Sequence, residues 1–275
     1  MTVGLRQNLK RVLPPALVDE LRRVSGGGIR FSGDYASWSD ASQAATGYDT
    51  DEILRRVTDA TRQVVAGKAA YERDSVLFAQ PAYSYPVLTA LLRSAALNHG
   101  RLRVIDFGGS LGSTYRQNQL FLDGLAQLQW CVVEQAHFVE VGQREFTTDM
   151  LTFARTLQAV PWWGQPCVVL LSSVLQYLED PQQLLVTLAD SGATSLVIDR
   201  TPMALSERDR LCVQTVPAQI YKASYPCRIF SKARLLDLLA GHWKLLTGFA
   251  SQDGVFITRE RLRFEFSGLI CEAQP

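Results

Sequence analysis

The sequence predicts an α/β fold in which a mostly parallel sheet of seven strands lies beneath a helical amino-terminal layer. After His99-Gly100, short apolar runs alternate with helical segments, which is typical of a parallel sheet. The first run leads into a glycine-rich turn that opens a helix. Only a short polar segment separates the last two runs, so they should form an antiparallel hairpin. The seven expected strands are residues 102–107, 130–134, 150–154, 167–172, 195–199, 243–250 and 263–271.

Composition limits the class of protein. The chain has 275 residues, 28 Lys and Arg, 27 Asp and Glu, and an apolar fraction of 47%. So many apolar side chains can bury a sizeable core, which excludes disorder over most of the chain. A net charge of +1 offers no positive surplus for displacing counterions, so no nucleic-acid partner is expected.

The five cysteines indicate a reducing compartment. They are widely spaced and never form a C-x-x-C pair, which argues against a disulfide framework or a zinc site, and no metal is expected. No apolar run approaches the roughly 18 residues needed to span a bilayer. The amino terminus also lacks the features of a signal peptide. We therefore expect a cytoplasmic protein.

Residues 1–30 differ from the rest of the chain and form a basic arm on a glycine hinge. Six basic residues face two acids there, and apolar residues recur between them at helical spacing. Packing on its own domain, or on a partner subunit in a homodimer, is favoured over peripheral contact with the inner face of a membrane, which needs a stronger basic and apolar signature. Residues 31–98 then form the helical layer, a candidate lid with helices near 51–66 and 87–97. Residues 99–275 form the main domain.

The sharpest local feature is the turn after the first expected strand. A phosphate-binding loop is excluded because no Lys lies near it, and the dinucleotide fingerprint G-x-G-x-x-G fails at Ser110 and Ser113. What remains is an acid followed by small residues at alternate positions: Asp106, Gly108, Ser110 and Gly112. This pattern resembles the first motif of class I S-adenosylmethionine-dependent methyltransferases. The resemblance implies that this cofactor binds at Asp106, Gly108, Gly109, Ser110 and Gly112.

Two further strand ends fit the same cofactor. Glu134 ends the second expected strand, where an acid can accept both ribose hydroxyls, and Gln135 follows it. The alternative is a surface carboxylate that begins a loop. The fourth strand ends in Ser172-Ser173 before an apolar turn and a helix start at Pro181. This arrangement resembles the corresponding region of the same superfamily, so both serines are candidate cofactor residues.

The resemblance extends to a small bacterial family of methyltransferases associated with surface-polysaccharide biosynthesis. It covers residues 31 to about 240, and the segments that carry it are 33–38, 71–74, 106–112, 133–135, 175–178, 198–202 and 223–226. It implies a Rossmann-like three-layer sandwich with the strand order 3-2-1-4-5-7-6. It also implies S-adenosylmethionine-dependent O-methylation of a sugar or sugar-linked intermediate, so the expected partner is a small-molecule or glycan-intermediate acceptor.

Three residues are candidates for acting on the acceptor, because ligands of an open parallel sheet bind beyond the carboxyl ends of its strands. His137 is the only histidine on that edge and could serve as general base, although starting the next helix is the favoured interpretation. Asp199 and Arg200 end the fifth strand. The acid could orient or deprotonate a hydroxyl, and the arginine could bind an anionic group such as a sugar-nucleotide phosphate. An internal ion pair between this strand end and the next loop explains both residues equally well.

Tyrosines are expected to form a wall of the acceptor pocket. Tyr221 and Tyr225 lie in the long connection after the fifth strand, where acceptor pockets are usually walled. Tyr83, Tyr85 and Tyr177 could complete the wall, although aromatic residues at such spacing more often belong to a core.

Two other classes of function stay open. One is a non-catalytic module that keeps the fold and serves as a scaffold in a polysaccharide-assembly complex. The other is a nicotinamide-dependent oxidoreductase, which the glycine spacing disfavours. The lack of an unambiguous base favours the scaffold, although methyl transfer from a sulfonium mainly requires that the protein align the acceptor and exclude water.

Overall fold

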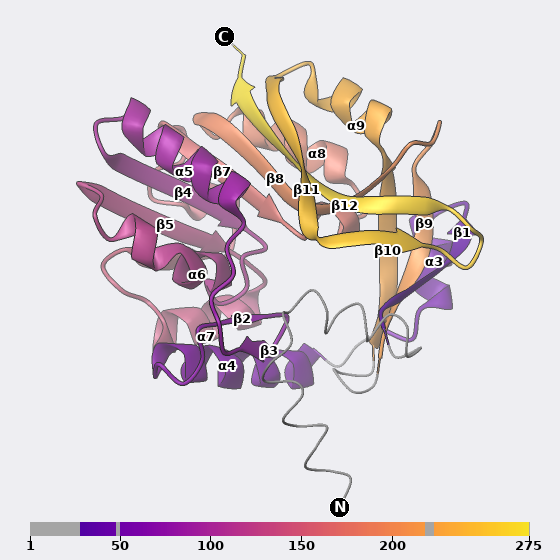
Figure 1. Cartoon of the computed structure of the whole chain (residues 1–275), viewed down its shortest axis with the longest axis horizontal. Coiled ribbons are helices and arrows are strands. Elements are labelled where there is room, and N and C mark those ends of the chain that lie inside the picture. Colours follow the sequence, from indigo (N-terminus) through magenta and orange to yellow (C-terminus); the bar gives the residue numbers. More distant parts are fainter. Residues whose placement is uncertain (1–27, 48–49, 218–222, 275) are drawn as a thin grey trace, which may run out of the picture.

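A computed structural model describes residues 28–47, 50–217 and 223–274. All but the last three residues of the predicted arm, 1–30, therefore lie outside the described residues, and so does Tyr221. Within the described parts, the chain forms a parallel α/β half and a second, antiparallel region that we call the β lobe. The strand β8 (Ala193–Ala204) runs through both (Figure 1).

The parallel half is built on five strands in the order β6-β5-β4-β7-β8. Besides β8, these strands are β4 (Arg101–Phe107), β5 (Gln127–Val133), β6 (Leu151–Ala154) and β7 (Cys167–Ser172). The helices of this half are α4 (Thr50–Val65), α5 (Tyr85–Leu97), α6 (Ser113–Leu122), α7 (Ala136–Glu145), α8 (Pro181–Ala189) and α9 (Lys232–Leu239). Two short 3-10 turns, Leu157–Ala159 and Leu175–Tyr177, complete it.

Side chains along each central strand alternate between two hydrophobic cores. Val104 and Val168 belong to the core beneath α4, α5, α6 and α7, whereas their neighbours Ile105 and Val169 belong to the core beneath α8 and α9. This follows from the period of two in a strand, and a strand covered on both faces has to be apolar on both. The apolar runs in the sequence have this origin.

The β lobe forms where β8 outruns its parallel neighbour. β7 pairs with β8 only as far as Asp199, and beyond that point β10 takes its place, with Phe230 opposite Met203. The lobe consists of β1 (Arg30–Tyr35), β9 (Arg210–Val216), β10 (Ala223–Ser231) and the far ends of β8, β11 (Trp243–Ile257) and β12 (Arg263–Ala273). Phe31 of β1 closes it by packing its ring against Phe264 at 4.9 Å.

Strands form at all seven predicted places, and the last two, β11 and β12, pair as the expected antiparallel hairpin. These seven strands follow the predicted order 3-2-1-4-5-7-6, as β6-β5-β4-β7-β8-β12-β11. Three further strands, β1, β9 and β10, bring the sheet to ten among the described residues, so its complete order differs from the predicted one. Its path runs β1-β9-β10-β8-β7-β4-β5-β6, while β12 pairs with β8 and carries β11. The sequence misses β9 and β10 because polar residues such as Gln214 interrupt their apolar pattern and Pro226 lies within β10.

The amino-terminal segment, predicted as a mainly helical layer, contains strands as well as helices. Its first part, β1 and α3 (Trp38–Ala44), belongs to the β lobe, where β1 pairs with β9. The two expected helices are present as α4 and α5 and cover the parallel sheet. Between them lies a hairpin of β2 (Tyr71–Arg73) and β3 (Val76–Phe78).

The structure also reports on cysteines, membranes and metals. All five cysteines are buried and free of disulfides. Burial raises the pKa of the Cys131 and Cys271 thiols to about 11. Within residues 28–47, 50–217 and 223–274, no helix is both long enough and apolar enough to cross a bilayer. In the same residues, no group of three or more His, Cys, Asp or Glu side chains is arranged to hold a metal ion.

Candidate functional site

A cavity of about 910 Å³ lies between the carboxyl ends of the parallel strands and the β lobe. Loops that follow β4, β5 and β7 line one part of it, and residues of β1, β9, β10, β11 and β12 line another. Its volume is at the upper end of the roughly 300–1,000 Å³ usual for small-molecule sites. The cavity can therefore hold a nucleoside-sized ligand together with a second small molecule.

The glycine-rich turn forms one wall of the cavity, and its backbone runs very close to other groups. Gly108 donates its N–H to the carbonyl oxygen of Val133 at 2.9 Å, which ties the turn to the neighbouring strand. A Cβ on Gly109 would lie 2.4 Å from the carboxyl carbon of Asp106, so any larger residue would force the turn or this carboxyl group to shift. Gly112 has a φ of 87° and caps α6, a conformation that favours glycine. The turn thus presents backbone rather than side chains to the cavity.

Asp106 lies buried beneath this turn. One carboxylate oxygen, Oδ2, accepts a hydrogen bond from the indole N–H of Trp130 at 3.0 Å. The other, Oδ1, has no partner among the described residues. Burial raises the pKa of Asp106 to about 7. A buried oxygen without a partner beside a ligand-sized cavity is suited to a hydrogen-bond donor on the ligand.

Glu134 faces the turn from the next strand. Its Oε2 accepts the N–H of Gln135 at 2.8 Å, and the backbone N–H of Ser110 also bonds to the carboxylate. Burial raises the pKa of Glu134 above its ordinary value, while these two N–H groups oppose the rise. His137 and Phe138 follow on the same wall, with their rings 5.0 Å apart. The two chain segments that the cofactor prediction requires therefore lie side by side on one cavity.

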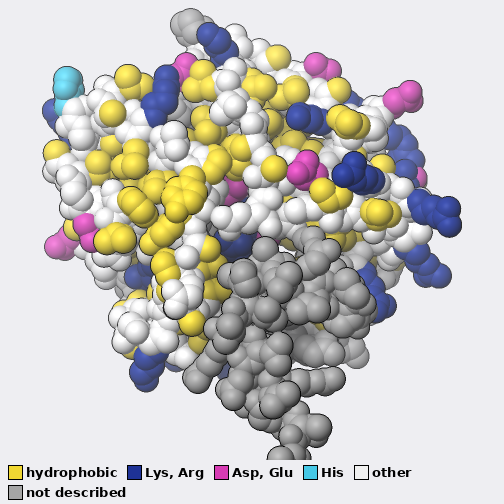
Figure 2. Space-filling view, in the orientation of Figure 1, with side chains coloured by type: hydrophobic (Ala, Val, Ile, Leu, Met, Phe, Trp, Pro, Cys, Tyr) yellow, Lys and Arg dark blue, Asp and Glu magenta, His cyan; other side chains and the backbone are white. Residues whose placement is uncertain are grey.

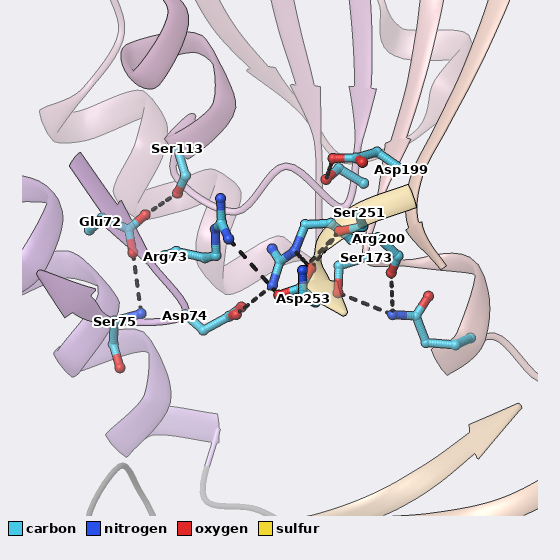
Figure 3. A network of polar contacts seen from close by, with 12 residues as sticks. Glu72, Arg73, Asp74, Ser75, Ser113, Ser173, Asp199, Arg200, Ser251 and Asp253 are labelled. Carbon is cyan, nitrogen blue, oxygen red and sulfur yellow. Dashed lines mark hydrogen bonds and ion pairs between the residues drawn. The ribbon is translucent and has the colours of Figure 1, made fainter. Parts of the chain in front are cut away.

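A network of charged residues crosses the middle of the site (Figure 3). The Nε of Arg200 lies 2.9 Å from Oδ2 of Asp253, and its Nη2 lies 3.0 Å from Oδ2 of Asp74. Arg73 approaches the other oxygen of Asp253 at 3.9 Å. Burial alone would lower the pKa of Arg200, but Asp253 and Asp74 raise it well above the ordinary value. The ion-pair alternative thus describes Arg200, although its partners lie in the β2–β3 turn and on β11 and not in the next loop, where they were predicted.

Asp199 points elsewhere. Its side chain is 5% exposed, and its Oδ2 accepts a hydrogen bond from Ser172 Oγ at 3.2 Å. It lines a second cavity of about 40 Å³, which it shares with Glu72 of β2. Burial raises the pKa of Asp199. Among the described residues, Asp199 is not on the wall of the large cavity, but the smaller cavity shares Arg73, Ser172 and Arg200 with that wall. Contact of Asp199 with an acceptor stays a prediction.

Glu72 connects the β2–β3 hairpin to the start of α6 through hydrogen bonds. Its two oxygens bond to the hydroxyl of Ser113 and, at 3.2 Å, to the N–H of Ser75. Burial raises its pKa to about 7. The hairpin is thereby held so that Asp74, in its turn, reaches Arg200 across the cavity (Figure 3).

Aromatic residues of the β lobe and of β3 line the remaining wall. The rings of Tyr177 and Tyr225 meet edge to face at 5.2 Å. Between them lies the buried amide of Gln214, which accepts from the Tyr177 hydroxyl at 3.0 Å and whose Nε2 donates to the Tyr225 oxygen at 3.3 Å. The other ring-bearing lining residues of this wall are Phe31, Trp38, Phe78, Phe256 and Phe266.

Tyr83 and Tyr85 are not part of this wall, contrary to the prediction. The Tyr83 ring packs on Phe121 at 4.9 Å, and Tyr85 is 64% exposed. Both lie at the start of α5, whose neighbour α6 carries the exposed Leu120. Figure 2 shows apolar side chains gathered on this outer face of the molecule. Spacing in the sequence gives no information on which side of a helix start faces a cavity.

Most predicted cofactor residues meet at the cavity. Those on its wall are Asp106, Gly108, Gly109, Ser110, Glu134, Gln135, Ser172 and Ser173, whereas Gly112 lies behind it as the cap of α6. Sequence reasoning missed Trp38, Asp74, Gln214 and Asp253. Asp74 and Trp38 lie in segments that carry the family resemblance, so a signal for them existed. Nothing local marks Gln214 or Asp253.

Comparisons with known proteins find similarity only among solved structures. No protein-family model matches the chain, and no curated protein matches its sequence. A 1,6-didemethyltoxoflavin-N1-methyltransferase from Burkholderia thailandensis is 12% identical over 89% of this chain and 93% of that one, with a TM-score of 0.43. An S-adenosylmethionine-dependent methyltransferase from Clostridium acetobutylicum is 8% identical over 80% and 99%, with a TM-score of 0.47. An amino pentose methyltransferase from Micromonospora echinaspora is 10% identical over 70% and 92%, with a TM-score of 0.45. Values of this size assign neither a family nor a function.

Proposed function

We propose that the protein is an S-adenosylmethionine-dependent methyltransferase that acts on a small molecule. One observation carries the proposal: the backbone turn 108–110 and the Glu134 carboxylate line the same cavity and contact each other through the Ser110 N–H. A backbone turn after the first parallel strand and an acid after the second are the two elements that an adenosyl ligand needs at this edge of a sheet. When bound, the cofactor supplies a methyl group on a sulfonium.

The residues around the turn can be given separate roles. Glu134 is suited to accept hydrogen bonds from the ribose hydroxyls, and Phe138 to flank the adenine. The unpartnered Oδ1 of Asp106 is suited to a donor at the amino-acid end. Proton transfer from the acceptor by His137 remains a prediction, supported by its place on the cavity wall.

The acceptor is less well supported. A sugar or sugar-linked intermediate of surface-polysaccharide biosynthesis was predicted from family resemblance alone, and it stays a prediction. The role of Arg200 in binding a sugar-nucleotide phosphate is not supported, because Asp74 and Asp253 already occupy its guanidinium. A non-catalytic scaffold remains the second candidate, favoured because Asp199 is not among the described residues that line the large cavity.

Calorimetric titration of the full-length protein with S-adenosylmethionine and S-adenosylhomocysteine tests the proposal. We expect binding of both, and a loss of about tenfold or more in affinity for Glu134→Ala, because charge-assisted hydrogen bonds to the ribose disappear. Glu207→Ala, at an exposed carboxylate outside the cavity wall, is the matched control and should bind normally. No binding by the wild type, or equal binding by Glu134→Ala, would overturn the assignment. Binding without methyl transfer to any acceptor would favour the scaffold.

A further inference from the structure

The acceptor part of the cavity is aromatic. Its rings come from separate regions of the chain, and they are Trp38 of α3, Phe78 of β3, Tyr177, Tyr225 of β10, and Phe256 and Phe266 of the β11–β12 hairpin. Rings of this kind offer flat apolar surface, and stacked or edge-to-face contacts with another ring add to the free energy of apolar burial. The wall therefore favours a planar ligand.

The polar group of this wall carries no charge. Gln214 is 4% exposed and lies between two tyrosine hydroxyls, so its amide is held in one orientation. A buried amide and phenols recognise a hydroxyl or carbonyl on a neutral ligand. A ligand that lacks such a group leaves these buried polar atoms without a hydrogen-bond partner and therefore binds less tightly. They do not compensate the desolvation of a phosphate.

The cations of the wall are already neutralised. Among the described residues that line the cavity, the arginines are Arg73, Arg155 and Arg200. Arg200 faces Asp74 and Asp253, Arg73 faces Asp253 at 3.9 Å, and Arg155 bonds to Glu140 at 3.0 Å. A phosphate that approached Arg200 would meet two carboxylates, and the repulsion works against it.

Building on the proposed function, we propose that the acceptor is an uncharged, planar aromatic molecule with a hydroxyl or carbonyl substituent, and not a phosphate-bearing sugar. Its ring lies among the aromatic side chains of the β lobe, and its polar substituent contacts the group formed by Gln214, Tyr177 and Tyr225. The charged network of Arg200, Asp74 and Asp253 then excludes anionic competitors.

The test compares ligands on the full-length protein saturated with S-adenosylhomocysteine. The probes are 1-naphthol and 6-hydroxyflavone as neutral aromatics and UDP-glucose as the phosphate-bearing sugar, each titrated by calorimetry. We expect at least one aromatic to bind about tenfold or more tightly than UDP-glucose. Trp38→Ala and Gln214→Leu should each weaken aromatic binding by about tenfold. Tyr85→Ala is the control, because it deletes an aromatic side chain on the outer face, and it should leave aromatic binding unchanged.

A charge variant sharpens the result. Asp74→Asn leaves Arg200 with one carboxylate fewer, so the affinity for UDP-glucose relative to that for the aromatics should rise severalfold; Asp59→Asn on exposed α4 is the control. Tighter binding of UDP-glucose by the wild type, or no binding of either aromatic, would overturn the acceptor class. Because saturation with S-adenosylhomocysteine is measured first, its absence would count against the methyltransferase assignment, and acceptor failure alone would not.

Discussion

The central parallel strand β7 and the edge strand β11 differ in how much of each strand is buried. Five of the six residues of β7 are buried, whereas Trp243 alone is buried among the fifteen residues of β11. The parallel half therefore needs apolar side chains on both faces and contributes backbone at its edge. The β lobe contributes side chains to the cavity, among them Gln214, Tyr225 and Phe266. This contrast suggests that cofactor binding depends on the path of the chain, and acceptor choice depends on residue identity.

We expect the largest effect from Phe31→Ala, which should disturb the β lobe and leave the cofactor side of the parallel half unchanged. Phe31 is 3% exposed and packs on Phe264 and Phe256, so its loss should lower the free energy of unfolding by about 3–5 kcal/mol. Urea denaturation measures this. Below the transition, S-adenosylmethionine affinity should stay close to wild type while affinity for 1-naphthol falls. Phe121→Ala, at a side chain 40% exposed, is the control. Equal loss of both ligands would contradict the separation of roles.

The second effect concerns Glu72, where the hairpin meets the parallel half. Its pKa is raised from 4.5 to about 7, so the folded protein keeps a proton that the unfolded chain has lost. The contribution of Glu72 to the free energy of unfolding is then complete below pH 4.5 and declines as the pH rises toward 7, by up to about 3 kcal/mol. Glu72→Gln should remove that part of the decline in urea denaturation measured from pH 4.5 to 7.5.

Asp106 gives the control for this pH dependence. Its pKa is also raised to about 7, so it contributes a decline of the same sign. Asp106→Asn should remove its own share, and the double variant should remove both. A decline unchanged in Glu72→Gln would show that this carboxyl titrates normally in the folded protein.

The smallest expected change in stability comes from Gly109→Ala. The added Cβ would press on the Asp106 carboxyl group, and overpacking of this kind costs about 1–3 kcal/mol. Cofactor affinity should fall by about tenfold, because the backbone turn must shift. Gly124→Ala, where no atom lies within 4 Å of the new Cβ, is the matched control. Normal cofactor binding by Gly109→Ala would mean that the turn is not the cofactor wall.

Much of the cofactor half could be predicted because its signals are local. Asp106 to Gly112 are consecutive along one turn, and Glu134 ends the adjacent strand, so strand alternation alone brings them to one edge. The same reasoning could not find the partners of Arg200. Asp253 lies where the pairing of β11 with β12 shifts register between Ala250 and Val255, and such irregularities redirect side chains.

The sequence by itself determined the parallel half, the turn at 108–112 and the acid at 134, since apolar periodicity and glycine positions act over a few residues. Tertiary structure alone decided the β lobe and the acceptor wall. Gln214 of β9 meets Tyr177 and Tyr225 because β10 takes the place of β7 beside β8, a choice made by long-range strand pairing. Long-range pairing depends on what the whole chain buries together, and no short segment records it.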